Sequence, residues 1–120
     1  MGGKDICETC MVPKNQRKKE EECGLCTAWE VTNGRWKMYL LWILRNGKKR
    51  FCEIEEETAG ISAKVLTTQL RELEADGLIS RTVYDEMPPR VEYSLTALGE
   101  EFVPVLEKMT EIGKRILQIQ

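Results

Sequence analysis

The chain has 120 residues, of which 42% are hydrophobic and 32% charged, and its formal net charge is −2. This length suits one packed domain with accessory segments. The chain contains no histidine, which excludes imidazole acid–base catalysis and zinc sites of the Cys2His2 kind. Its longest apolar run, Met38–Leu44, is far shorter than the roughly 20 residues of a membrane-spanning helix. The polar amino terminus lacks the apolar stretch of a secretory signal, so we expect a cytoplasmic protein.

Residues 1–26 form a polar, cysteine-rich segment that cannot fold on hydrophobic burial alone. Cys7-x-x-Cys10 and Cys23-x-x-Cys26 are separated by twelve residues, a spacing typical of a four-thiolate zinc site. One zinc ion per chain would also order the segment. Three alternatives remain open, namely an iron–sulfur cluster, a thiol–disulfide switch and cysteines without a special role.

Residues 27–120 are expected to form the folded domain. Apolar residues at helical spacing predict a helix over 27–45, with a possible break near Asn33-Gly34. A short extended link at Arg50-Phe51 leads to a brief helix over 53–59.

A longer helix is predicted over 62–76, with Gly60 providing the preceding turn and Ser62 as its N-cap. Gly77 follows as a residue suited to the left-handed conformation at a helix end. Leucines mark the face that is expected to be buried, and polar or basic residues project from the other side. The buried set is Leu66, Leu70 and Leu73, and the projecting set is Lys64, Thr67, Thr68 and Arg71.

Two β-favouring segments, 78–84 and 90–95, then predict a hairpin with a Pro-Pro tip. The last segment predicts a long amphipathic helix over 98–119, bent near Pro104. The first half of its apolar stripe is expected to be core. Beyond Met109 the stripe extends past the domain, so we expect Ile112, Ile116 and Ile119 to pack on a partner helix.

Charge is strongly segregated along the chain despite the small net value. Residues 34–50 hold six basic residues and no acidic ones, and residues 51–60 hold four glutamates and no base. Salt screens the electrostatic field of each charged group beyond about 10 Å, so a ligand responds to the charges close to it. The net charge therefore does not exclude a polyanionic partner.

The predicted fold class is α+β, mostly α: a winged helix-turn-helix with a long C-terminal dimerisation helix and a Cys-rich N-terminal segment. The order of a helix, a short helix, a turn, a longer helix and a two-stranded hairpin carries this prediction. Such a fold suits duplex DNA, because its second motif helix fits a major groove about 12 Å wide.

Several motifs in this order identify a resemblance. They are Gly34–Lys37, Gly47–Phe51, Leu66–Ile79, Pro88–Thr96 and Leu98-Gly99. Together, over about residues 23–116, they resemble the HxlR-type transcriptional regulators, which are relatives of the MarR-like winged helices. The resemblance implies a homodimer on double-stranded DNA, with the longer helix in the major groove, the hairpin wing beside the minor groove, and the terminal helices in the dimer interface.

The resemblance assigns DNA contacts residue by residue, and a solvated surface charge is the alternative for each cation. The residues implied for the recognition helix are Ser62, Lys64, Thr67, Thr68 and Arg71; Arg90 serves the wing; Lys48, Lys49 and Arg50 hold phosphates. Glu72, Glu74 and Asp76 would be repelled by phosphate, so only the first turns of the helix should approach DNA. Trp36, Trp42, Phe51 and Tyr93 are expected in the core, with a small-molecule pocket as their alternative role.

The resemblance bears on the cysteines too. Cys23, thirteen residues before Trp36, stands where HxlR-type proteins often carry one cysteine, which some relatives use as a redox sensor. The three additional N-terminal cysteines depart from that pattern. Cys52 follows Arg50 near the start of a short helix, so it is either a reactive thiol or buried filler.

The sequence therefore predicts a sequence-specific DNA-binding regulator that responds to thiols or metal through its N-terminal cysteines. A protein-interaction module with a four-cysteine metal knuckle is the alternative. An enzyme is disfavoured, because a phosphate-binding glycine loop, a nucleophile elbow and the βαβ setting of a thiol oxidoreductase are missing from the sequence.

Overall fold

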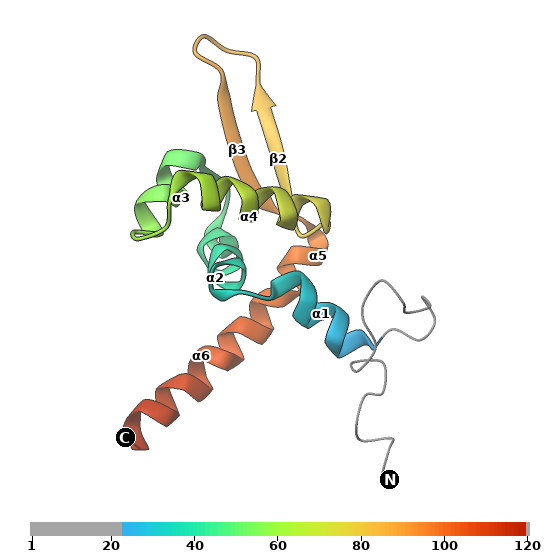
Figure 1. Ribbon diagram of the computed structural model, residues 1–120, viewed down its shortest axis with the longest axis vertical. Coiled ribbons are helices and arrows are strands. Elements are labelled where there is room, and N and C mark those ends of the chain that lie inside the picture. The colour runs from blue at the N-terminus through green and yellow to red at the C-terminus, as the bar shows by residue number, and fades with distance from the viewer. Residues whose placement is uncertain (1–22, 120) are drawn as a thin grey trace. The chain divides into compact units, whose positions relative to one another are not determined.

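A computed structural model describes residues 23–119, and the chain divides into two compact units between residues 33 and 34. In the first unit, helix α1 (Gly24–Thr32) begins after the extended residue Cys23. The second unit contains α2 (Arg35–Ile43), the 3-10 turn η5 (Leu44–Asn46), β1 (Lys49–Arg50), α3 (Phe51–Glu57), α4 (Ala63–Ala75), β2 (Ile79–Tyr84), β3 (Arg90–Leu95), α5 (Ala97–Glu100) and α6 (Phe102–Ile119) (Figure 1). The predicted α+β, mostly helical winged helix-turn-helix is confirmed.

Gly34 separates the first two helices with a φ of 104°, a value that glycine adopts readily, so the predicted break near Asn33-Gly34 is confirmed. Gly77 likewise ends α4 with a φ of 80°. The N–H of Leu78 donates to the carbonyl of Leu73 at 3.0 Å, which closes the last turn of that helix.

The sheet has three antiparallel strands in the order β1-β3-β2. We call the β2–β3 hairpin, residues 79–95, the wing; it extends past α4 in Figure 1. The sequence predicts a short extended link at Arg50-Phe51, which is confirmed for Arg50 and wrong for Phe51. Lys49 and Arg50 form a strand on β3, and Phe51 already starts α3, because Glu53 accepts the backbone N–H of Arg50 at 2.8 Å and thereby caps the helix early.

The core lies between α2, α3, α4 and the end of the wing that is farthest from its Pro-Pro tip. Its buried apolar residues are Leu40, Leu41, Ile43, Leu44, Ile54, Leu66, Leu70, Leu73, Leu78, Ile79, Tyr93 and Leu106. The predicted burial of the three leucines of α4 is therefore confirmed. Among the aromatics expected in the core, Tyr93 is buried, whereas Trp36, Trp42 and Phe51 are only half-buried.

The C-terminal segment is two helices, α5 and α6, instead of one helix bent near Pro104. The break falls at Glu101, and Pro104 occupies the first turn of α6, where a missing N–H costs no helical hydrogen bond. The expectation that the first half of the apolar stripe is core is wrong for Leu98 and Val105, which are 51% and 53% exposed. Only Leu106 of α6 is buried.

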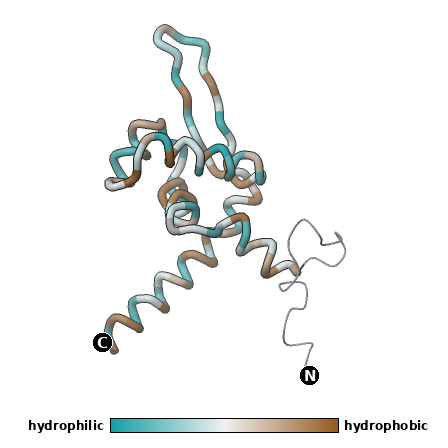
Figure 2. The backbone as a smooth tube through the Cα atoms, in the orientation of Figure 1, coloured by the Kyte–Doolittle hydropathy of each residue, from teal (hydrophilic) through white to brown (hydrophobic). Residues whose placement is uncertain are grey.

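One apolar stripe of α6 is exposed along its whole length, and Figure 2 shows hydrophobic residues recurring along this helix. We call Val105, Met109, Ile112, Ile116 and Ile119 the α6 stripe; their exposed fractions range from 43% for Ile112 to 85% for Ile119. No helix within residues 23–119 combines the length and apolar character needed to cross a membrane.

Candidate nucleic-acid interface

Helix α4 presents two opposite faces. Its N-cap is Ser62, whose Oγ accepts the N–H of Val65 at 3.1 Å, as predicted from the sequence. The leucines at positions 66, 70 and 73 point into the core. The other side carries the residues that we call the α4 outer face: Lys64, Thr67, Thr68 and Arg71. Their spacing of three, four and seven residues places them together, and all but the half-buried Thr67 are exposed.

The two threonines of the α4 outer face use their hydroxyl protons within the helix. Thr67 Oγ1 donates to the carbonyl of Ala63 at 2.8 Å, and Thr68 Oγ1 donates to that of Lys64 at 3.0 Å. With their protons used, these hydroxyl oxygens can only accept hydrogen bonds, and a phosphate oxygen has no proton to donate. They therefore suit a hydrogen-bond donor on a base edge, and the threonine methyl groups suit the methyl group of thymine.

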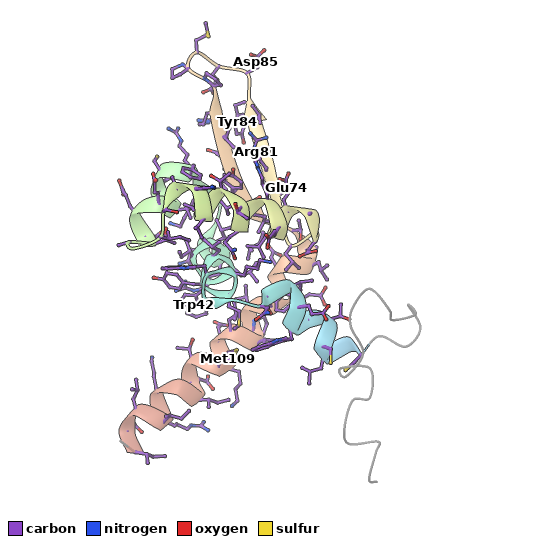
Figure 3. The ribbon with its side chains drawn as sticks, in the orientation of Figure 1. Trp42, Glu74, Arg81, Tyr84, Asp85 and Met109 are labelled. Carbon is purple, nitrogen blue, oxygen red and sulfur yellow. The ribbon has the colours of Figure 1, made fainter. Side chains whose placement is uncertain are left out.

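The acidic residues of α4 lie toward its C-terminal end, where Glu74 follows Arg71 by three positions and so shares this face. Glu72 forms an ion pair with Lys37 of α2 at 2.6 Å, and the Lys37 side chain is only 10% exposed. Lys37 therefore links α2 to α4 and is not a free cation. Glu74 (Figure 3) and Asp76 are exposed near the C-terminal end of the helix.

Two of the three basic side chains in segment 48–50 form ion pairs within the protein. Lys49 Nζ lies 3.1 Å from Glu57 Oε2, and Lys48 Nζ lies 3.5 Å from Glu92 Oε1. Arg50 is exposed, and no ion pair to its side chain is found within residues 23–119. Of the three predicted phosphate ligands, Arg50 is therefore the most available.

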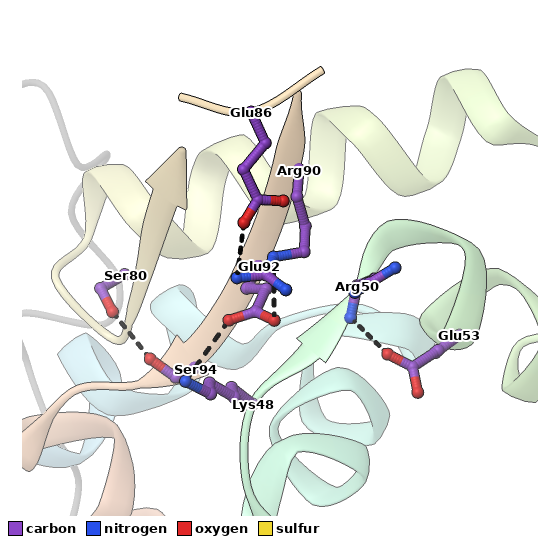
Figure 4. A network of polar contacts seen from close by, with 8 residues as sticks. All are labelled: Lys48, Arg50, Glu53, Ser80, Glu86, Arg90, Glu92 and Ser94. Carbon is purple, nitrogen blue, oxygen red and sulfur yellow. Dashed lines mark hydrogen bonds and ion pairs between the residues drawn. The ribbon is translucent and has the colours of Figure 1, made fainter. Parts of the chain in front are cut away.

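The wing contains a polar network centred on Glu92 (Figure 4). The Glu92 side chain is only 13% exposed, and its Oε2 lies 3.6 Å from Arg90 Nε. The Arg90 guanidinium also lies 3.4 Å from Glu86 and stacks 4.2 Å from the centre of the Tyr84 ring. Arg90, the predicted wing cation, is thus held by two carboxylates and an aromatic ring.

Both charges in the Lys48–Glu92 pair are stabilised. Burial alone would raise the pKa of Glu92, but the hydrogen bond from Tyr84 and the charges of Lys48 and Arg90 outweigh it and lower that pKa. Tyr84 and Glu92 raise the pKa of the Lys48 ammonium. The pair is therefore fully ionised near neutral pH.

Arg81 is a surface cation of the wing that is absent from the set indicated by the sequence. It lies on β2 opposite Tyr93, so it shares the hairpin face that packs on the core, and its side chain is exposed (Figure 3). No ion pair to it is found in the part of the chain that the structure describes. Ile79, Arg81 and Val83 occupy every second position of the strand and therefore share one face. This spacing is the signal that could have identified Arg81.

The cysteines fall in different settings. Cys7 and Cys10 lie outside the described residues. Cys23 is the free N-cap residue of α1, and Cys26 is disulfide-bonded. Cys52 is a free, exposed thiol in the first turn of α3, so its interpretation as buried filler is wrong. Within residues 23–119, no three Cys, Asp or Glu side chains cluster as a metal site.

A shallow apolar groove of about 350 Å³ lies between α2 and α6. It is lined by Met38, Tyr39, Trp42, Leu106, Met109 and Thr110. Met109 also belongs to the α6 stripe, so the stripe adjoins the groove; Figure 3 labels Met109 of α6 and Trp42 of α2, which both line the groove.

Comparisons with known proteins agree with this architecture. The sequence model of the HxlR-like helix-turn-helix family matches residues 31–120. The chain is 44% identical over 95 residues to the HTH-type transcriptional regulator YkvN of Bacillus subtilis (strain 168). The aligned region covers 79% of this chain and 80% of YkvN. The reduced form of the redox regulator HypR superposes with a TM-score of 0.76 at 40% identity, covering 82% of this chain and 100% of HypR. The reduced form of the transcriptional regulator YodB from B. subtilis gives 0.68 at 34% identity, covering 75% and 89%.

Proposed function

Because this chain belongs to the HxlR-like helix-turn-helix family, which comprises transcriptional regulators and not enzymes, we propose that it binds a specific operator sequence as a homodimer. The observation that carries the proposal is the α4 outer face, where Lys64, Thr67, Thr68 and Arg71 project opposite the buried leucines. A helix with this pattern enters the major groove with its side chains on the base edges.

The residues of the interface have different roles. Arg71 reads a guanine, because its planar guanidinium can donate two parallel hydrogen bonds to a base edge. Thr67 and Thr68 supply methyl and acceptor groups beside it. Lys64, in the first turn of α4, binds phosphate, and Arg81, which has no ion pair within residues 23–119, supplies positive charge from the wing.

The homodimer would form through the α6 stripe. A row of five apolar side chains that are all more than two-fifths exposed is a poor surface for an isolated chain. A second copy of α6 would cover this row and would also fill the α2–α6 groove. Two recognition helices related by a two-fold axis would then read two half-sites.

Fluorescence anisotropy with a labelled duplex from the chain's own upstream region tests the proposal. We expect saturation at two chains per duplex and an affinity that falls about 10³-fold or more between 50 and 200 mM salt, because a dimer contacts six or more phosphates. A scrambled duplex of the same composition should bind far more weakly. Equal affinity for the two duplexes, or binding that is insensitive to salt, would contradict the proposal.

We further propose that DNA affinity depends on the state of the N-terminal thiols. HypR, which has a similar fold, is named a redox regulator. YodB, also of similar fold, has been solved in a reduced form and in a form treated with diamide, a thiol oxidant. In this chain, the free thiol of Cys23 stands at the start of α1, close to the disulfide-bonded Cys26. Either a disulfide switch or, once the disulfide at Cys26 is reduced, a zinc site built with Cys7 and Cys10 would serve this response.

The response is tested by repeating the DNA titration with diamide. We expect the affinity of the wild-type chain to change by about 5- to 150-fold, a normal range for coupled sites. Cys23→Ser should lose the change, and the matched variant Cys52→Ser should keep it. Bound zinc near one atom per chain would identify the metal form, and its absence the disulfide form. A diamide response that persists in Cys23→Ser would contradict the role of this thiol.

A further inference from the structure

The outer part of the wing carries more acid than base. Between Tyr84 and Glu92 there are three carboxylates, Asp85, Glu86 and Glu92, and a single cation, Arg90. Arg90 pairs with Tyr84 on the last rung of the hairpin, next to the tip. A wing with this charge would bind phosphate poorly unless Arg90 were released from its carboxylates.

The Arg90–Glu92 pair is better shielded from solvent than the Arg90–Glu86 pair, although it is the longer contact, at 3.6 Å against 3.4 Å. The Glu92 side chain is 13% exposed, whereas Glu86 is 50% exposed and its pair with Arg90 is screened by solvent. Glu92 also contacts Lys48, so one carboxylate neutralises a cation at each end of the network (Figure 4).

We propose that Glu92 is an internal counter-ion that withholds Arg90 from DNA phosphate and thereby limits binding to DNA of any sequence. The proposal deepens, and rests on, the proposed DNA-binding function. Phosphate contacts carry most of the affinity that does not depend on sequence. An engaged wing cation would strengthen binding to operator and other DNA alike, whereas a neutralised one leaves discrimination to the α4 outer face.

Replacing Glu92 by a DNA phosphate as the partner of Arg90 is unfavourable in this geometry. If Arg90 moved to a phosphate, it would leave its stack on Tyr84, and a largely buried carboxylate would lose one of its two cations. Glu92 would keep only Lys48 as its partner, and reducing the charge compensation of a largely buried carboxylate costs free energy. Arg81 and Lys64 make no ion pair in the described part of the chain, so they can bind phosphate without such a penalty.

The test compares four chains, namely wild type, Glu92→Gln, Arg90→Ala and the double variant, on a duplex of scrambled sequence. We expect Glu92→Gln to bind about 3- to 10-fold more tightly at low salt, and the salt slope of the dimer to become steeper by about 1.8, the value for one additional neutralised phosphate in each of its two chains. The gain should vanish in the Arg90→Ala background. Glu101→Gln is the matched control, because it removes the same charge from an exposed residue without an ion pair among those described.

Several results would overturn the inference: equal binding by Glu92→Gln and Glu101→Gln, a gain that survives Arg90→Ala, or weaker binding with an unchanged salt slope. Glu92→Thr, which matches its cross-strand neighbour Thr82, replaces Glu92→Gln if circular dichroism shows that the latter is unfolded. A wild-type chain that binds the upstream region but shows none of these changes refutes only the counter-ion. A wild-type chain that does not bind the upstream region refutes the proposed function itself.

Discussion

Gly99→Ala is expected to destabilise the domain by about 3 kcal/mol, the upper end of the range for forced overpacking. A Cβ atom at Gly99 would overlap the carbonyl oxygen of Leu78 and would lie 3.0 Å from its carbonyl carbon. These are backbone atoms, so they cannot rotate away. The same carbonyl accepts the N–H of Thr96 at 3.1 Å, and the Thr96 hydroxyl donates to the carbonyl of Gly77 at 2.6 Å. Relieving the overlap would therefore separate α5 from the junction of α4 and β2.

Thermal unfolding followed by circular dichroism measures this effect. For a domain of this size, a loss of 3 kcal/mol lowers the Tm by more than about 10 °C. Gly113→Ala is the matched control, because nothing lies within 4 Å of a Cβ at that position of α6. It should leave the Tm unchanged or raise it slightly, since alanine favours helix. If Gly99→Ala melts at the wild-type temperature, the tight packing of α5 on Leu78 is not present in solution.

Arg71→Ala is expected to weaken operator binding by about 10- to 100-fold, because a bidentate contact to guanine contributes about 1–3 kcal/mol. The Arg71 side chain is exposed and makes no ion pair within residues 23–119, so its removal should not change the stability of the fold. Lys64→Ala should instead weaken binding to all duplexes to a similar extent and reduce the salt slope by about 1 for each phosphate that is no longer neutralised.

Lys114→Ala is the control for both variants. Lys114 is an exposed cation on the side of α6 opposite the α6 stripe, and no ion pair to it is found among the described residues. It removes the same charge without altering the α4 outer face. Comparable decreases in affinity for Lys114→Ala and Arg71→Ala would show that net charge, and not the position of Arg71, determines the affinity.

The sequence predicts α4 well because its signals are local. Ser62 has the right side chain for an N-cap, Gly77 accepts the left-handed conformation, and the leucine spacing defines the buried face. The candidate interface follows from these features, since residues seven or fewer positions apart on one helix face must lie together.

The electrostatics of the wing could not be predicted in this way. Glu92 contacts Lys48 across more than forty positions in the sequence, and this contact depends on the pairing of β1 with β3. A basic run such as Lys48-Lys49-Arg50 is typical of phosphate binding, but two of its three side chains are paired with glutamates of other elements. Tertiary ion pairs of this kind have no periodic signal in the sequence.

The break between α5 and α6 shows a different limit of sequence patterns. A proline is compatible with the first turn of a helix, so Pro104 marks the vicinity of a break without giving its position. The burial of Gly99 against Leu78 fixes where α5 lies, and it results from the return of the chain after the hairpin.

The proposed role of the α4 outer face is to read the operator sequence. Its most direct test is the ratio of the affinities for the operator and a scrambled duplex, measured by anisotropy at one salt concentration for the wild type and Arg71→Ala. Removal of a base contact should reduce this ratio by about 10-fold or more, because the scrambled duplex does not offer the same guanine to Arg71. A ratio that stays at the wild-type value while both affinities fall together would contradict this role.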